Sequence, residues 1–187
     1  MDAIHRRSCC IPQQQGVALV MAMVFLLILT LIGVAAMGTA SLEEKMAGNQ
    51  TDKTRSFQAA ESALITAENW INGLISKPVF PDNSIGLYTT ATGATPVWDS
   101  LDWSGTASLV VYPSTPTGSA SGGLNQVKTQ PKYIIEDMGE VPEVGGSISL
   151  SSSYKGKGNT VVRITAYGSG GTDTATTLLQ TTYSRPF

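Results

Sequence analysis

The sequence predicts an α+β fold in which one long N-terminal helix packs on a small antiparallel β-sheet. Three observations lead to this prediction. An apolar run, Val17–Met37, is followed without a break by a stretch with helical periodicity, and this stretch ends before Pro78. After Pro81 the composition changes to Gly, Ser, Thr and Pro, with short runs rich in β-branched and aromatic residues between them.

The apolar run is long enough to cross a membrane. No charged residue occurs in the range 8–42, and nearly every residue of Val17–Met37 is apolar. A helix needs about 20 residues to cross the hydrocarbon layer, whereas the apolar core of a secretory signal has only about 7 to 15. We therefore expect the run to be retained. The flank formed by His5, Arg6 and Arg7 is expected to stay cytoplasmic and to direct the rest of the chain outward.

Two other fates of this run stay open. Ordinary secretion would cut the chain after Ala40, where Gly38 and Ala40 supply the small residues that a signal peptidase requires, although the run is overlong for that purpose. A plain uncleaved anchor would explain the hydrophobicity and the flanking charges. It would predict nothing about the remainder of the chain.

The helical pattern continues beyond the run. Apolar or small residues recur mostly at three- and four-residue steps, and charged residues occupy the other faces. One helix is therefore expected from about Val17 to about Ile75, and at 1.5 Å per residue it would be on the order of 90 Å long. Pro78 and Pro81 are expected to end it. The positions of the apolar stripe are Leu42, Met46, Phe57, Ala60, Leu64, Ala67, Ile71 and Leu74.

Five later runs are expected to be strands, and the last two are expected to pair as an antiparallel hairpin through the turn sequence GSGGTD. In the first strand of this hairpin every second side chain is apolar, so one face should pack on the helix while the other meets water. The packed face holds Val162, Ile164 and Ala166, and the water-facing one holds Arg163, Thr165 and Tyr167. The five runs are Ala107–Tyr112, Lys132–Glu136, Ser147–Leu150, Thr160–Tyr167 and Thr174–Tyr183.

The N-terminal third resembles a type IV prepilin, and most closely a PilX-type minor pilin. The residues that carry the resemblance are a short charged leader ending in Gly16, an apolar helix beginning at Val17, and the segment EEKMAGNQTDKTRSFQAAESAL, residues 43–64. The later segments PKYIIEDMGE and VVRITAYGSGGTDTATTLLQTTY resemble the same group more loosely. The resemblance implies the type IV pilin fold, with a leader at 1–16, a transmembrane and assembly half-helix at 17–40, an amphipathic half-helix at 41–76 and a β-rich domain at 77–187.

The resemblance also implies how the protein is processed and used. A prepilin peptidase would cut between Gly16 and Val17, and the new amine of Val17 would be methylated. The protein would sit in the bacterial inner membrane with its C-terminal domain in the periplasm, and would then enter the pilus fibre at the cell surface. Its implied partners are other minor pilins, the major pilin and a tip adhesin. Its implied role is to help initiate pilus assembly and to support adhesion and twitching motility.

Met21 departs from the pattern of most pilins, which carry a glutamate at this fifth mature position. A carboxylate at this depth costs about 2.5 to 3.5 kcal/mol on insertion scales, so it needs a cationic partner. In the family that partner is the N-terminal amine of the subunit already ahead in the fibre. A subunit with Met21 cannot offer this contact, which suits a place at or near the tip, where nothing lies ahead. The alternative is that Met21 simply faces lipid.

The net charge and the residue types present argue against two other classes of function, nucleic-acid binding and enzymatic catalysis. The formal charge is -2 and the basic residues after the leader are scattered singly, so nucleic-acid binding is not expected. His5, Cys9 and Cys10 all precede Gly16, so a chain cut there has no His or Cys for a catalytic triad or a metal site. The acids Asp99, Asp102, Glu136, Asp137 and Glu140 show no spacing that distinguishes them from surface residues. We expect no enzymatic activity, no cofactor and no metal.

Two alternatives to a pilus subunit stay open. The first is a tip pseudopilin of a type II secretion system, which also lacks the glutamate. That class usually carries a large inserted helical domain, for which the residues from 77 onward leave little room. The second is a membrane-tethered periplasmic binding module that never assembles.

Overall fold

The computed structural model describes residues 15–81, 85–89, 95–142 and 158–187. The chain divides into two compact units, residues 1–47 and 48–187, and each is considered by itself below. The strand predicted at Ser147–Leu150 lies outside the described residues.

The predicted long helix is confirmed. Helix α1 (Gln15–Gly73) has 59 residues, and each of its ends lies two residues earlier than the sequence suggested. Gly33, Gly38 and Gly48 lie inside it, and nothing approaches within 4 Å of the place where a side chain would begin at any of the three. The helix ends before Pro78, because a proline cannot continue the pattern of backbone hydrogen bonds.

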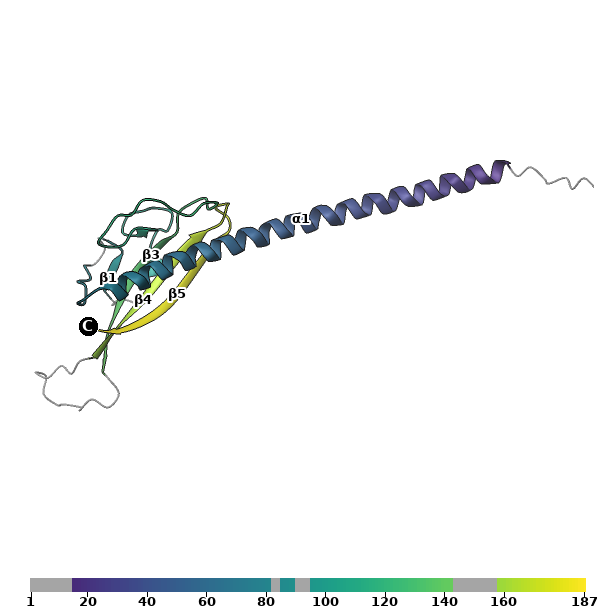
Figure 1. Ribbon diagram of the computed structural model, residues 1–187. Helices are drawn as coiled ribbons and strands as arrows, with labels where there is room; N and C mark the ends of the chain where they lie inside the picture. Colours follow the sequence, from purple (N-terminus) through teal and green to yellow (C-terminus); the bar gives the residue numbers. More distant parts are fainter. Residues whose placement is uncertain (1–14, 82–84, 90–94, 143–157) are drawn as a thin grey trace, which may run out of the picture. The chain divides into compact units, whose positions relative to one another are not determined.

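The second unit contains one sheet (Figure 1). Its strands are β1 (Leu87–Thr89), β2 (Val110–Val111), β3 (Lys132–Pro142), β4 (Gly158–Ser169) and β5 (Thr176–Pro186), and a short helix, α2 (Val97–Ser100), lies between β1 and β2. The strand order is β1-β3-β4-β5, with β2 also paired to β3. The predicted hairpin is the antiparallel pair β4–β5.

The expectation of an antiparallel sheet needs one correction. The pairs β2–β3, β3–β4 and β4–β5 are antiparallel, but β1 pairs with β3 in parallel, so the sheet is mixed. Strand β1 has only three residues. A run this short carries no readable alternation of apolar and polar residues, which is why the sequence did not indicate it.

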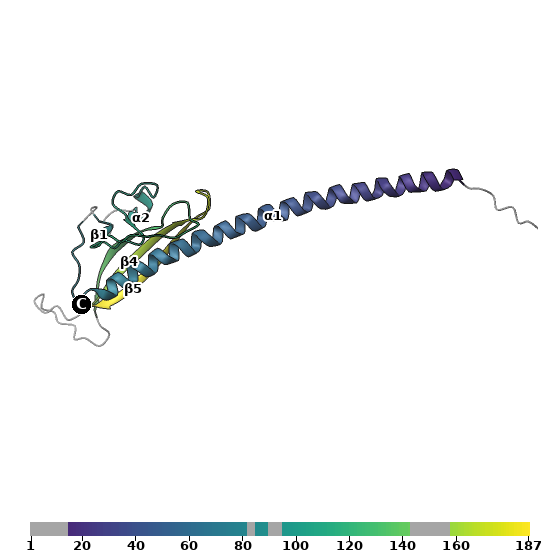
Figure 2. The same ribbon diagram turned by 45° about the horizontal axis from the view of Figure 1, so that its top comes forward.

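One face of the sheet packs on the second half of α1, as predicted from the alternation along β4. Figure 2 shows this part of α1 lying along β4 and β5. The helix contributes Ala63, Ala67 and Ile71, all buried, to this core. The strands contribute Tyr133 and Ile135 from β3 and Val162, Ile164 and Ala166 from β4.

Close approach of α1 to β4 depends on small residues at the contact. A Cβ atom added to Gly168 would lie 2.3 Å from the carbonyl oxygen of Ser56 and 2.5 Å from the amide nitrogen of Ala60. Both of these atoms belong to the helix backbone, so they cannot turn aside as the end of a flexible side chain would. Only glycine therefore allows the helix to rest on β4 at this distance.

The opposite face of the sheet is also covered, and the prediction that it meets water is wrong. Thr165 is fully buried, and the ring of Trp103 stacks on that of Tyr167 with 5.6 Å between their centroids. The covering segment, residues 97–131, leads from α2 through β2 back to β3. A second core lies at this contact. Its buried residues are Tyr88 of β1, Ile134 of β3 and Leu109 of the covering segment, and its partly buried members, all from the covering segment, are Val97, Trp98, Leu101 and Trp103.

Substitution of Gly168 by Ala should destabilise the second unit. The added methyl group meets helix backbone, so the helix must move away from β4, at a cost of at least about 2 kcal/mol. Unfolding can be followed by tryptophan fluorescence, because Trp70, Trp98 and Trp103 all belong to the second unit.

Gly48→Ala is the matched control, because it places a methyl group in open space on the same helix. It should raise stability by about 0.5 to 1 kcal/mol, since alanine favours helix more than glycine does. Equal midpoints for the two variants would contradict the packing argument.

Candidate assembly helix and its anchor on the sheet

The three residues singled out in the sequence lie in the first two turns of α1. Gly16 and Val17 belong to its first turn, and Met21 follows Val17 by four residues, so Val17 and Met21 share one face of the helix. All three are exposed, with Val17 at 59% and Met21 at 57%. Nothing lies within 4 Å of the position of a Cβ atom on Gly16, so packing within the described chain does not require glycine there.

The apolar part of α1 is exposed on all of its sides. Large apolar side chains from Val17 to Met37 are about half exposed or more, and α1 is the one helix in the described residues that is long and apolar enough to cross a membrane. Its most apolar stretch of 18 residues has a mean hydropathy of 3.0, and none of this stretch is buried. An apolar surface of this size needs lipid or other helices around it, because water around it is unfavourable.

Asp52 fastens the second part of α1 to the β4–β5 turn. Its carboxylate accepts hydrogen bonds from the backbone N–H groups of Gly171 and Thr172 and from the hydroxyl of Thr172. The Thr172 hydroxyl, above all, and the two amides lower the pKa of the Asp52 carboxyl below its usual value, against a smaller opposing effect of burial. The sequence placed Asp52 only on a polar face, because a turn 119 residues away leaves no local pattern.

Strand β5 is tied to α1 along its length. Near its start, the hydroxyls of Ser56 and Thr177 lie 2.6 Å apart, and Lys53 donates to the carbonyl of Thr176. Near its end, Tyr183 donates to the side chain of Asn72, and Arg185 donates to the carbonyl of Ile71. Both α1 and β5 therefore run in the same direction, and the helix is held beside the strand at both ends.

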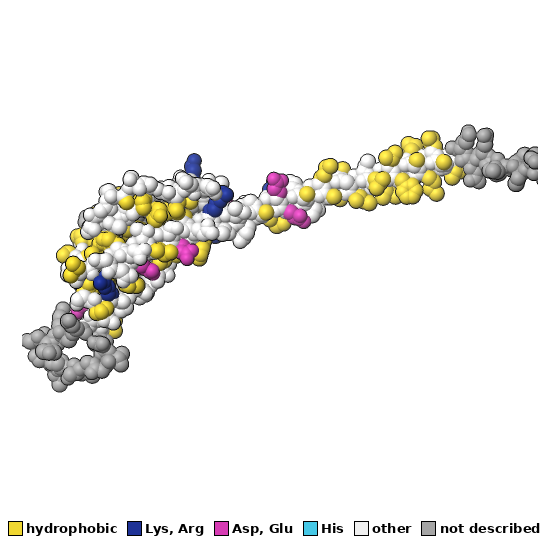
Figure 3. Space-filling model, viewed as in Figure 1, with side chains coloured by type: hydrophobic (Ala, Val, Ile, Leu, Met, Phe, Trp, Pro, Cys, Tyr) yellow, Lys and Arg dark blue, Asp and Glu magenta, His cyan; other side chains and the backbone are white. Residues whose placement is uncertain are grey.

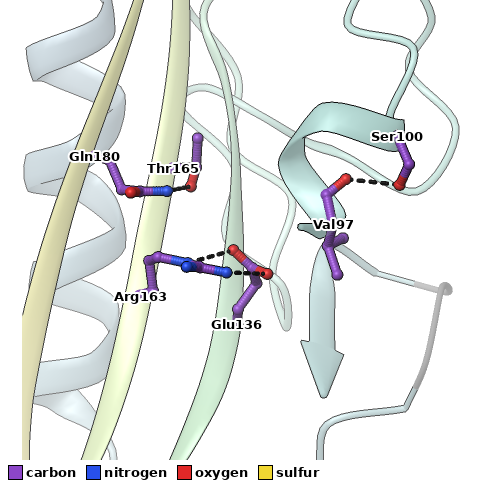
Figure 4. A network of polar contacts seen from close by, with 6 residues as sticks. All are labelled: Val97, Ser100, Glu136, Arg163, Thr165 and Gln180. Carbon is purple, nitrogen blue, oxygen red and sulfur yellow. Dashed lines mark hydrogen bonds and ion pairs between the residues drawn. The ribbon is translucent and has the colours of Figure 1, made fainter. Parts of the chain in front are cut away.

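A buried ion pair lies on the opposite face of the sheet. Glu136 is fully buried, and both of its carboxylate oxygens accept 2.8 Å hydrogen bonds from the Arg163 guanidinium. Figure 4 shows the pair between β3 and β4, beside α2. Two parallel bonds to one guanidinium are the strong form of this contact, and they raise the pKa of Arg163. The interpretation of Glu136 as a surface acid is wrong.

Lys132 holds the covering segment onto this same face. Its ammonium donates to the carbonyl oxygens of Trp103, Ser104 and Gly105, at 2.8, 3.1 and 2.7 Å. All three N–H bonds of the ammonium group are thereby used. Burial lowers the pKa of Lys132, while the charge of Asp102 acts in the opposite direction.

Of the other acids named in the sequence, Asp99 is exposed, and the remaining three have structural contacts. Asp102 accepts hydrogen bonds from the backbone and the hydroxyl of Ser104. Lys77 pairs with Asp137 at 2.9 Å and approaches Glu140 at 3.9 Å. Within the part of the chain that the structure describes, no three His, Cys, Asp or Glu side chains gather as a metal site would need.

Two protein-family models match this architecture. The PilX N-terminal model matches residues 15–64, which cover most of α1. The model of the type IV pilus assembly protein PilX C-term matches residues 43–185, which include the amphipathic part of α1 and the whole sheet except the last residue of β5. The chain belongs to the PilX family of type IV pilus assembly proteins. No curated protein and no solved structure matches it.

Membership of the PilX family explains why the two parts of α1 differ. The family is one of type IV pilus assembly proteins, and the first part of α1 is long and apolar enough to anchor such a protein in a membrane. The resemblance drawn from residues 43–64 and from the two C-terminal segments is confirmed, as is the α+β pilin fold.

The Asp52 contact predicts a dependence of stability on pH. Because the folded-state pKa of Asp52 is lowered, its carboxylate should stabilise the fold above its ordinary pKa of about 3.9. This stabilisation should be lost as the pH falls through the folded-state pKa. Asp52→Asn should therefore unfold earlier than the wild type at pH 7, and the difference should shrink as the pH falls through the folded-state pKa, because the wild-type carboxyl then becomes protonated.

Thermal unfolding followed by tryptophan fluorescence at several pH values measures this difference. Thr172→Val removes the hydroxyl that contributes most to the lowered pKa, and should reproduce part of the effect. A difference between wild type and Asp52→Asn that does not shrink as the pH is lowered from 7 into the acid range would contradict the assignment.

Proposed function

We propose that this PilX-family protein is a minor pilin that is cut between Gly16 and Val17 by a prepilin peptidase. Residues 1–16 are then the leader, 17–40 the membrane and assembly segment, 41–76 the amphipathic half-helix and 77–187 the periplasmic domain. The mature protein waits in the inner membrane and then enters the pilus at or near its tip. There it helps to initiate assembly with other minor pilins, the major pilin and a tip adhesin, and so supports adhesion and twitching motility.

The observation that carries this proposal is the uncharged, exposed surface around Met21. No charged residue occurs in the range 8–42, so this part of α1 offers no carboxylate to the amine of a subunit ahead of it. Its own N-terminal amine, created by the cut before Val17, remains available to the next subunit. One-sided pairing of this kind fits a subunit that begins a fibre rather than one within it.

The alternatives to a minor pilin at the tip predict different structures or locations. A tip pseudopilin of a type II secretion system usually carries a large inserted helical domain, and besides α1 the described residues contain a single helix, the four-residue α2. A membrane-tethered periplasmic binding module would share the fold and the anchor, and would stay in the membrane fraction. If Met21 only contacts lipid, other residues determine the position of the protein in the fibre.

The mature N-terminus distinguishes these fates. Mass spectrometry of the protein isolated from membranes should find a chain that begins with N-methylated Val17. A chain that begins at Ser41 would indicate ordinary secretion, and an intact Met1 a plain anchor. Presence of the methylated chain in sheared fibres then separates a pilin from a tether, because a tether remains with the cells.

Position in the fibre can be tested by Met21→Glu. The carboxylate gives the subunit the contact that a subunit within the fibre makes, so labelled protein should be found along the shaft rather than at the tip alone. Met21→Leu, which keeps the side chain apolar and similar in volume, is the control and should leave the position unchanged. Unchanged tip labelling of Met21→Glu would remove the support that charge gives to the tip position.

A further inference from the structure

Strand β5 forms one edge of the sheet and has few of the features that usually protect such an edge. It pairs with β4 alone, and its eleven residues follow one unbroken register. No charged residue occurs from Thr176 to Ser184, and its single proline is Pro186 at the very end. Natural sheets protect edges with charges, prolines, bulges or very short strands. The three-residue strand β1 is short in this way, and β5 is not.

The backbone of β5 presents a row of free hydrogen-bonding groups. In an antiparallel pair, residues alternate between those that bond to the neighbouring strand and those that point away from it. The bond from Gly170 N–H to the carbonyl of Ala175 fixes which residues these are. The outward-pointing residues after Thr176 are Leu178, Gln180, Thr182 and Ser184.

A basic side chain lies at each end of this row. Lys53 donates to the outward carbonyl of Thr176, and Arg185 donates to the carbonyl of Ile71 beyond the other end. Between these two contacts, the outward-pointing N–H and C=O groups of the four residues form no hydrogen bond with any other described residue. The side chains of the same four residues are exposed.

The side of α1 next to this edge carries acidic and apolar side chains. Phe57, Glu61, Leu64 and Glu68 follow one another at helical spacing, and we call them the outer flank of α1. Asn72, four residues beyond Glu68, contacts Tyr183, and Ser56, next to Phe57, contacts Thr177, so the outer flank lies beside β5. Figure 3 shows acidic side chains among hydrophobic ones along this stretch of helix.

The outer flank has unused binding capacity. The large side chain of Phe57 is 47% exposed. Glu61 and Glu68 form no ion pair within the described part of the chain, where the three ion pairs involve Lys77 and Arg163. A strand added next to β5 would run along this flank, and every second side chain of it would face the helix.

We propose that β5 and the outer flank of α1 together form an acceptor site for an extended segment of another protein. The segment adds to the sheet as a sixth strand, and its backbone bonds to the four outward-pointing residues of β5. On the helix side it carries apolar residues and Lys or Arg in alternation, opposite Phe57, Glu61, Leu64 and Glu68. This site does not depend on where the protein stands in a pilus or on how its N-terminus is cut.

A second copy of this chain does not fit the site. Two β5 strands paired in antiparallel fashion would place both α1 helices on the same face of the joined sheet, with their outer flanks opposite each other. Glu61 and Glu68 of one copy would then face the same acids of the other, and like charges repel at this range. The acidic flank therefore favours a basic partner of different sequence.

Two capped peptides can test the proposal on the full-length protein in neutral detergent micelles. The basic peptide TVTKTVTKT alternates valine and lysine on one side, and the acidic peptide TVTETVTET replaces both lysines by glutamate. The basic peptide should bind about tenfold more tightly, because two opposite-charge contacts replace two like-charge contacts. Amide-resolved hydrogen exchange should slow at Leu178, Gln180, Thr182 and Ser184, and not at β1.

Two sets of variants separate the strand contact from the charge contact. Thr182→Pro removes one outward N–H that β4 does not use and should abolish binding, whereas Thr182→Val keeps that N–H and should bind as the wild type does. The double variant Glu61→Lys, Glu68→Lys should prefer the acidic peptide. Because it leaves β5 unchanged, it still tests the proposal if Thr182→Pro fails to fold.

Several results would overturn the proposal. Equal affinity of the wild type for both peptides would remove the role of the outer flank, and binding by folded Thr182→Pro would remove the role of the edge. Slow exchange of the four amides without any peptide would mean that the edge is already occupied. If that protection rose with protein concentration, the occupant would be a second copy.

Discussion

The close contact between α1 and β4 at Gly168 is the constraint on which the second unit depends. The missing side chain lets the helix backbone at Ser56 and Ala60 rest against the strand, and this sets the depth at which Ala63 and Ala67 meet the sheet. Alanines at these positions are a consequence of the same short distance, since larger side chains would not fit. The hydrogen bonds of Asp52 to the β4–β5 turn, and those between α1 and β5, then hold the helix in this position.

The sequence predicted those elements whose signal is local. The long helix, its end before Pro78 and the β4–β5 hairpin follow from periodicity and turn residues, and the structure confirms them. What covers the second face of the sheet could not be predicted, because alternation along β4 shows which side chains share a face and not whether a distant segment returns over it. Glu136 illustrates this: its guanidinium partner is 27 residues away, and no spacing reveals the pair.

The surroundings of α1 change along its length, and this change explains why its residue composition changes too. Up to Leu42 the helix is apolar on every side, as suits a membrane or a bundle of pilin helices, where all sides meet hydrocarbon. Around the sheet the buried stripe consists mainly of alanines, and polar or charged side chains occupy most of the remaining surface. The residues proposed for processing, Gly16 and Val17, belong to the first region. Their proposed role depends on a peptidase outside this chain, so only the family resemblance could indicate them.

The three hydrogen bonds of Lys132 have a practical consequence for chemical labelling. An amine-directed dye reacts with an accessible, unprotonated amine nitrogen, whereas the Lys132 nitrogen is enclosed by the carbonyls of Trp103, Ser104 and Gly105. The exposed Lys45 and Lys53 on α1 are accessible to such a reagent while the fold is intact. Modification at Lys132 therefore reports that the segment over the second face has opened, and the chain carries its own marker of damage during purification.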